Sequence, residues 1–286
     1  MPRKWVEPAA DLVVCGNPFS VSERRRGIRV ARDGPGARSR MSNCLVVQHV
    51  IPESAFAIED ALLAAGVSVD TRRVFAGDAV PSDISGLDGV VVMGGPMSAN
   101  SEAGFPSREA ELSLLAEALR IGIPTLGVCL GAQLLALAGG GTVAPNAYGP
   151  EIGWAPIYLA PSCGEDQLLS GLPPTFTVLH WHDDSFDVPP GAQLLISSGA
   201  NPHQAFRIGD VAWGVQFHLE VTAEAVDGFL RAFGADTAAV PGGAEAVRAA
   251  TAGALAELGP TRDLVCTRFA GLVAARVTRG DLVELE

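Results

Sequence analysis

Several features that would place a chain of 286 residues in a particular class are scarce in this one. The five cysteines are odd in number, widely scattered and form no C-x-x-C pair, which excludes a disulfide framework and a cysteine zinc site. They are Cys15, Cys44, Cys129, Cys163 and Cys266. Positive charge is also scarce: 20 Lys and Arg stand against 32 Asp and Glu, so the net charge is -12. Nucleic acids need clustered positive charge, and we therefore expect no nucleic-acid partner.

Long apolar runs are absent too. No stretch approaches the roughly 18 apolar residues of a membrane span, and the N-terminal residues form no uninterrupted signal-peptide core. We expect a cytoplasmic protein with no membrane partner, in a reducing compartment that suits a working thiol.

Histidine is scarce as well, with five in the chain. The run His180-x-His182-x-Asp184 superficially resembles a metal-binding segment, because histidines with a carboxylate are good zinc ligands. However, Ser185 stands where a further histidine would follow, and no other segment supplies a second cluster. We therefore predict no metal and no organic cofactor, and interpret the segment as a pocket-lining loop.

What is present is a regular alternation of short apolar runs and helical patterns. Continuous apolar runs are typical of parallel strands that are buried on both faces. Strands joined through helices predict right-handed crossovers and an α/β doubly wound, mostly parallel sheet, with the site at the carboxyl ends of the strands. The predicted strands are 44–50, 67–74, 89–93 and 124–128, and the predicted helices are 54–65 and 107–122.

The second half of the chain is richer in strands. We expect it to extend or flank the sheet and to end in a helix over 222–233, before two further helical stretches at 244–258 and 263–277. The predicted organisation is a disordered N-terminal extension over 1–40, a domain over 41–235 and a C-terminal helical extension over 236–286. The strands expected in the second half are 154–159, 176–179, 193–197, 205–208 and 212–217.

The segment Gly127 to Gln133 predicts a strand, a tight turn and a helix, with Cys129 at the tip of the turn. A residue at such a tip is held in a strained conformation, and small neighbours let a reacting carbonyl approach it. Taken alone, a cysteine is more often a small buried side chain. The glycines at 127 and 131 favour the nucleophile instead.

A thiol that attacks a carbonyl needs a base and a stabiliser for the oxyanion. His218 and Glu220 follow an apolar strand two residues apart, so the carboxylate can orient the imidazole. The backbone N–H of Leu130 follows the nucleophile, and that of Gly95 lies at the same predicted sheet edge. These two groups are the predicted oxyanion donors.

Three motifs in this order resemble the class I glutamine amidotransferase family, and in particular its stand-alone, GMP-synthase-like members. They are Gly94-Gly95-Pro96, Gly127-x-Cys129-x-Gly131-x-Gln133 and His218-x-Glu220. The resemblance implies a flavodoxin-like fold, with Cys129 as the nucleophile, His218 as the base and acid, and Glu220 as its orienting carboxylate. It also implies that Gly95 and Leu130 hold the oxyanion.

The same resemblance implies that Gln133 contacts the bound substrate and that Trp181 and His182 lie in a substrate-lining loop. Asp183 replaces the glycine that is common in that loop. The implied reaction is hydrolysis of the glutamine side-chain amide through a γ-glutamyl thioester. The residues leave two alternatives open: a γ-glutamyl hydrolase or peptidase acting on another γ-glutamyl compound, and a non-catalytic binding or regulatory module.

The segment after residue 234 is too short for an ATP-binding module and contains no phosphate-binding G-x-x-x-x-G-K-[ST] loop. Transfer of ammonia would therefore need a separate synthetase subunit as partner.

Overall fold

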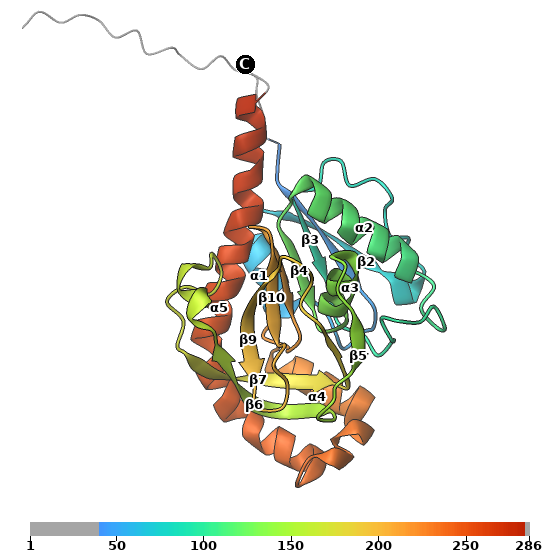
Figure 1. The fold of residues 1–286 in the computed structure, drawn as a ribbon, viewed down its shortest axis with the longest axis vertical. Helices are drawn as coiled ribbons and strands as arrows, with labels where there is room; N and C mark the ends of the chain where they lie inside the picture. Colours follow the sequence, from blue (N-terminus) through green and yellow to red (C-terminus); the bar gives the residue numbers. More distant parts are fainter. Residues whose placement is uncertain (1–39, 284–286) are drawn as a thin grey trace, which may run out of the picture. The chain divides into compact units, whose positions relative to one another are not determined.

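The structure is a computed structural model that describes residues 40–283, with the side chains of residues 239 and 277–283 left out. Within this part of the chain, nine strands form one sheet in the order β2-β1-β3-β4-β11-β10-β9-β6-β7 (Figure 1). The strands from β2 to β11 are parallel to their neighbours, and those from β11 to β7 are antiparallel. The bounds are β1 Asn43–Gln48, β2 Ser68–Arg73, β3 Gly89–Val92, β4 Thr125–Val128, β6 Glu151–Leu159, β7 Thr175–His182, β9 Gln193–Ser198, β10 Ala205–Ile208 and β11 Ala212–Val215. A small second sheet pairs β5 (Val143–Pro145) with β8 (Asp184–Phe186).

Strands β1 and β3 supply both faces of the sheet with apolar side chains. In β1, Cys44 and Val46 enter one buried cluster, whereas Leu45 and Val47 enter the other. This alternation follows from the period of two in a strand. It confirms the α/β class with a mostly parallel sheet that is covered on both sides.

Helices α1 (Phe56–Ala64), α4 (Ala223–Phe233) and α5 (Gly243–Val283) cover the first face. Helices α2 (Arg108–Ile121) and α3 (Leu130–Ala138) cover the second. In Figure 1, α1 and α5 lie on one side of the central strands, and α2 and α3 lie on the other.

The ends of the elements differ from the prediction where polar residues are buried. Strand β6 begins at Glu151 and β7 continues to His182, so the paired segment is longer than the apolar runs suggest. Helix α2 ends at Ile121 and is capped by Gly122, which adopts a left-handed conformation with φ 63°. Ser107 precedes α2, but its side chain makes no capping hydrogen bond. Thr222 does cap α4, because its side-chain oxygen accepts a hydrogen bond from the Ala225 N–H at 3.2 Å.

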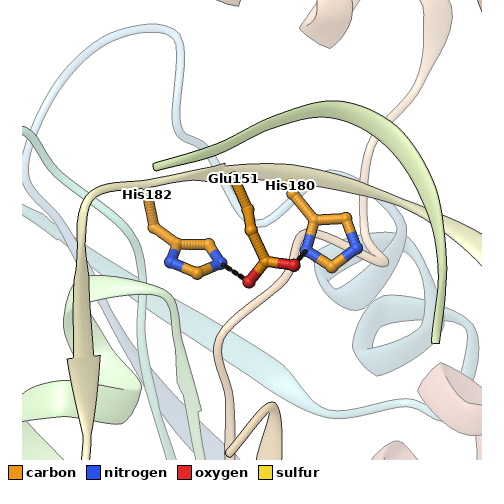
Figure 2. A group of neighbouring side chains, drawn as sticks. All are labelled: Glu151, His180 and His182. Atoms are coloured by element: carbon orange, nitrogen blue, oxygen red, sulfur yellow. Dashed lines mark ion pairs between the residues drawn. The ribbon is translucent and has the colours of Figure 1, made fainter. Parts of the chain in front are cut away.

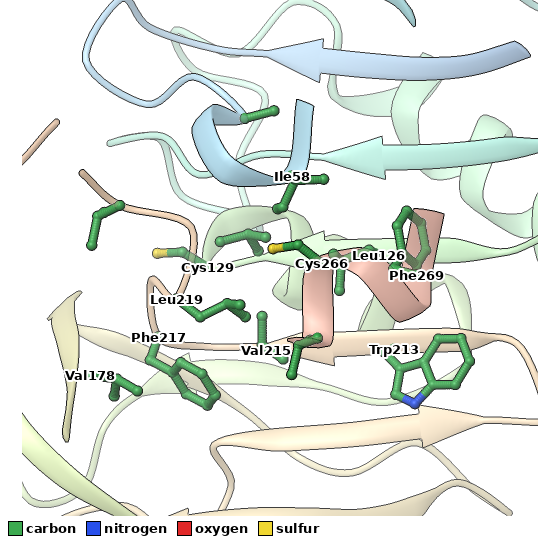
Figure 3. Close-up of a cluster of buried hydrophobic side chains, with 14 of the residues drawn as sticks. Ile58, Leu126, Cys129, Val178, Trp213, Val215, Phe217, Leu219, Cys266 and Phe269 are labelled. Atoms are coloured by element: carbon green, nitrogen blue, oxygen red, sulfur yellow. The ribbon is translucent and has the colours of Figure 1, made fainter. Parts of the chain in front are cut away.

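The C-terminal segment forms a single helix, α5, with Pro260 inside it, where the sequence suggested two. Its apolar residues belong to the core: Cys266 and Phe269 lie in the same cluster as Leu126 of β4 (Figure 3). The Arg268 guanidinium donates to the carbonyls of Leu168 and Ser170 at 2.8 and 2.7 Å. These contacts join α5 to the loop that precedes β7.

The N-terminal extension predicted over 1–40 lies outside the described residues except for Arg40, which pairs with Asp88 at 2.8 Å. Within residues 40–283, none of the helices combines the length and the apolar content needed to cross a bilayer. Cytoplasmic location stays a prediction.

The packing of α5 predicts that Phe269→Ala will be strongly destabilising. Phe269 is fully buried, so its loss should leave a cavity and lower the free energy of unfolding by about 3–5 kcal/mol. Leu264→Ala on the same helix is the matched control, because Leu264 is 39% exposed and should cost much less. Denaturant unfolding of both variants checks this. Equal costs would show that α5 is not part of the core.

Candidate active site

The turn between β4 and α3 holds Cys129 in an unusual backbone conformation, with φ 51° and ψ −107°. Such a conformation costs about 1–3 kcal/mol and persists only where the surroundings enforce it. Here the surroundings are close backbone contacts. A Cβ on Gly127 would lie 2.4 Å from the Gly131 carbonyl oxygen, and a Cβ on Gly131 would lie 1.9 Å from that of Val92. Only glycine therefore fits on either side of the turn.

The imidazole and the carboxylate reach this turn from the neighbouring strand. Val215 of β11 is in register with Val128 of β4, so the chain beyond each strand emerges at the same sheet edge. The Nδ1 atom of His218 lies 2.8 Å from Oε1 of Glu220, and both side chains are fully buried. Burial disfavours a charged ring, but the charge and hydrogen bond of Glu220 and the interaction with Cys129 together outweigh it and raise the pKa of His218 well above its ordinary value.

The thiol of Cys129 is held by several neighbours. It donates to the Trp181 carbonyl and accepts from the Gln216 amide, both at 3.7 Å. Burial raises the pKa of the thiol, while the interaction with His218 and the backbone N–H of Leu130 lower it. The Nε2 atom of His218 makes no hydrogen bond of ordinary geometry, so this nitrogen stays available to the thiol or to a substrate.

A cavity of about 400 Å³ opens beside the sulfur. This volume is within the usual range of small-molecule sites. His218 and Glu220 do not line it and lie buried behind the cysteine. The other side chains and backbone segments that the sequence singled out all line it, namely Gly95, Cys129, Leu130, Gln133, Trp181 and His182. The roles of these residues stay predictions.

Gln133 is already engaged within the protein. Its amide nitrogen lies 3.3 Å from both the Asp184 carbonyl and Oε1 of Gln216. Gln216 in turn contacts the Cys129 sulfur. The sequence reasoning assigned Gln216 no role, although it stands two residues before His218 on the same side of an extended chain. That period could have identified it.

The Gly94-Gly95 turn is held from behind by a buried His–Glu pair. His49 Nδ1 donates to the Gly94 carbonyl at 2.9 Å, and His49 Nε2 lies 2.8 Å from Oε2 of Glu111. Burial lowers the pKa of His49, but the contacts with Glu111 and the Gly94 carbonyl and the charge of Glu53 together outweigh it, so the pKa is raised and both nitrogens can donate. Glu111 looked like an ordinary first-turn acid of α2; it is in fact fully buried.

Glu53 is a further residue of the site that the sequence did not identify. It lines the cavity, and a Cβ on Gly94 would lie 1.8 Å from its Oε2, so the carboxyl group rests directly on this glycine. That oxygen has no hydrogen-bond partner. Burial raises the pKa of Glu53 to about 7, against the opposing effect of His218. No sequence pattern could have identified it, because it stands in a short loop after Pro52.

A strained cysteine at a strand-to-helix turn, beside a buried His–Glu pair and a cavity, defines a cysteine-dependent hydrolase of the α/β class. The model of the family "Glutamine amidotransferase class-I" matches residues 54–233. The chain therefore belongs to the class I glutamine amidotransferases, a family of cysteine-dependent amide hydrolases.

Individual relatives agree with this assignment. The chain is 33% identical over 169 residues to the glutamine amidotransferase-like protein YfeJ of Salmonella typhimurium. The aligned region covers 58% of this chain and 70% of that protein. It is 37% identical over 154 residues to a glutamine-hydrolysing GMP synthase of Porphyromonas gingivalis, covering 52% of this chain but 28% of the synthase. The crystal structure of a glutamine amidotransferase from Thermotoga maritima matches with a TM-score of 0.73 and 27% identity, over 82% of this chain and 99% of that one.

The position of Glu53 predicts that its charge disfavours ionisation of the Cys129 thiol. Ionised Glu53 raises the pKa of Cys129, so Glu53→Gln should leave more thiolate at a given pH. We expect Cys129 to be alkylated by iodoacetamide roughly two- to tenfold faster in this variant at pH 7.5. Quantifying the modified Cys129 peptide by mass spectrometry against time measures the rate.

The control for Glu53→Gln is Glu102→Gln, which removes an exposed carboxylate and should leave the rate unchanged. Unaltered or slower alkylation of Cys129 in Glu53→Gln would contradict the electrostatic role.

Proposed function

We propose that the protein hydrolyses the side-chain amide of glutamine, with Cys129 as the nucleophile, His218 as general base and acid, and Glu220 as the carboxylate that orients the ring. The observation that carries the proposal is the strained Cys129 at the wall of a cavity with the buried His218–Glu220 pair behind it. The interaction with Cys129 contributes to the raised pKa of His218, which supports proton transfer between the two side chains.

In the first half of the reaction, the thiol proton passes to His218 and the sulfur attacks the γ-carbonyl carbon. The carbonyl π-electrons move to oxygen, where the N–H groups of Leu130 and Gly95 would hold the negative charge. When the tetrahedral intermediate collapses, His218 gives its proton to the amide nitrogen. Ammonia leaves and a γ-glutamyl thioester remains on Cys129.

In the second half, His218 takes a proton from water and the hydroxide attacks the thioester. The carbon–sulfur bond breaks, glutamate leaves, and the proton returns from His218 to the sulfur. Glu220 stays ionised throughout and stabilises the charged ring at each stage.

The charge of the cavity supports an amino-acid substrate. Glu53, Asp183, Asp184 and Asp236 all line it, and such a surface favours the α-ammonium group of glutamine. Asp236 is held in place because its carboxylate accepts a hydrogen bond from the Trp181 indole at 3.0 Å.

The size of the cavity favours one further candidate. At about 400 Å³ it has more room than a single amino acid fills, so a larger γ-glutamyl compound is the second candidate substrate. We also propose that any transferred ammonia passes to a separate synthetase chain, because the match covers only 28% of the relative named GMP synthase.

The proposal predicts that purified protein releases glutamate and ammonia from glutamine and that Cys129→Ala lowers the rate by at least about 10³-fold. Cys163→Ala is the matched control, since Cys163 is a buried cysteine that does not line the cavity. Acid quenching during turnover should trap a γ-glutamyl group on the Cys129 peptide, visible by its mass. Glu220→Gln should lower kcat by about 10²–10⁴-fold, because the ring loses its orienting charge.

Faster turnover of another γ-glutamyl compound than of glutamine would select the second candidate. Folded wild-type protein that turns over neither substrate, with and without a synthetase partner, would contradict the proposal and favour a binding module.

A further inference from the structure

Next to the cavity, the antiparallel pair β6–β7 assembles three side chains that the sequence keeps apart. Glu151 is in register with His182, and Gly153 is in register with His180. Residues two apart in a strand share a face, so Glu151, His180 and His182 all project to the same side of the sheet. Gly153 leaves the position opposite His180 without a side chain. Figure 2 shows the result: the Glu151 carboxylate lies between the two imidazoles and points one oxygen at each.

The hydrogen bonds of His182 set its ring tautomer so that one ring nitrogen and the Glu151 carboxylate face each other without a hydrogen between them. Its Nδ1 lies 3.1 Å from the Asp184 carbonyl, which can only accept, so Nδ1 carries the proton. In the neutral ring Nε2 then presents a lone pair, and it faces Oε2 of Glu151 at 3.3 Å. Two electron pairs that face each other at this distance repel unless a cation lies between them.

His180 adds a second unpaired donor atom. Its Nδ1 lies 3.9 Å from Oε1 of Glu151, and neither ring nitrogen makes a hydrogen bond of ordinary geometry. The side chains of both histidines are 1% exposed, so neither ring is open to bulk solvent at the protein surface. A shared proton between His182 and Glu151 would leave His180 unpaired.

We propose that Glu151, His180 and His182 bind a divalent transition-metal ion of the zinc type. Two neutral imidazoles and one carboxylate are a common zinc ligand set, with the fourth position open to water. Bonds of about 2.0–2.1 Å in a tetrahedron separate the ligand atoms by about 3.3–3.5 Å. In the cluster the three ligand atoms lie within 4.8 Å of one another, so small side-chain rotations close the site.

The surroundings resemble those of built metal sites. Metal ligands are typically held by hydrogen bonds from a second layer of residues. Ser198 Oγ donates to Oε1 of Glu151 and Gln204 Nε2 donates to Oε2, each at 2.6 Å. The Asp184 carbonyl fixes the tautomer of His182. His182 also lines the cavity, which provides a path for the ion.

The prediction of no metal depended on the residues next to the two histidines in the chain, where Ser185 stands in place of a third ligand. The register of β6 supplies Glu151 instead. A bound ion would tie β6 to the end of β7, the segment that presents Trp181 and His182 to the cavity, and would thus position the cavity wall. It would take no part in the attack on the amide.

Zinc binding tests the proposal most directly on the full chain in a Cys129→Ser background, which removes a competing thiol at the active site. After chelator treatment, equilibrium dialysis should show one Zn²⁺ per chain with a Kd of about 10 µM or lower. Cobalt(II) in place of zinc should give visible d–d absorption without a sulfur charge-transfer band, since the proposed ligands are nitrogen and oxygen. The ion should also raise the Tm of this protein, because it binds only the folded state.

His180→Gln should weaken zinc binding at least about 100-fold, and Ser198→Ala, which leaves every ligand in place, about tenfold. His203→Gln is the control and should change nothing, because His203 pairs with Asp187 at 3.6 Å in a more exposed position outside the cluster. Far-UV circular dichroism confirms that each variant is folded.

Two results would overturn the proposal. One is the absence of saturable binding to the folded Cys129→Ser protein up to about 100 µM Zn²⁺. The other is equal binding in His180→Gln, which would place the ion elsewhere. In the first case, an NMR signature of both ring nitrogens of His182 protonated would identify a shared proton as the cation between His182 and Glu151.

Discussion

The site depends on how closely α3 approaches the sheet. Gly131 packs against the backbone of Val92 and Gly127 packs against Gly131, at distances that leave no room for a side chain. Together these contacts hold Cys129 at φ 51°, a conformation that a free chain would leave. The cost of this turn is offset by two apolar cores, one on each face of the sheet, which keep β3, β4 and α3 in place.

Around this turn, buried carboxylates lie against buried imidazoles. Glu220 contacts His218 behind the thiol, Glu111 contacts His49 beneath the Gly94 carbonyl, and Glu151 stands between His180 and His182. Buried charges are costly unless they are paired and hydrogen-bonded. These buried pairs recur along one edge of the sheet. At this edge, polar contacts with defined geometry replace the apolar packing of the core.

Like Glu111 and Glu220, Glu53 has a buried carboxylate oxygen without a hydrogen-bond partner. It shares its environment with His49, His218 and Glu220, so the charge of the site as a whole decides its protonation. A carboxyl group with a pKa of about 7 beside the Cys129 thiol makes the local charge sensitive to pH in the neutral range. The strongly acidic cavity wall extends this negative charge to the region where a substrate would enter.

The sequence by itself determined the elements that depend on local patterns. Apolar runs predicted the parallel strands, and a glycine predicted the end of α2. The spacing of Gly127, Cys129 and Gly131 identified the turn. Each of these signals depends only on residues that are neighbours in the chain. The pair His218 and Glu220 was likewise predictable from its separation of two residues.

Only the tertiary structure decided what depends on register between distant segments. It placed Glu53 on Gly94, Glu111 on His49 and Glu151 opposite His182, and it joined α5 to the core despite Pro260. Such contacts produce no periodic pattern in the sequence. In the sequence, a buried acid in a helix or a loop cannot be distinguished from an exposed one, because only the fold shows which groups it faces.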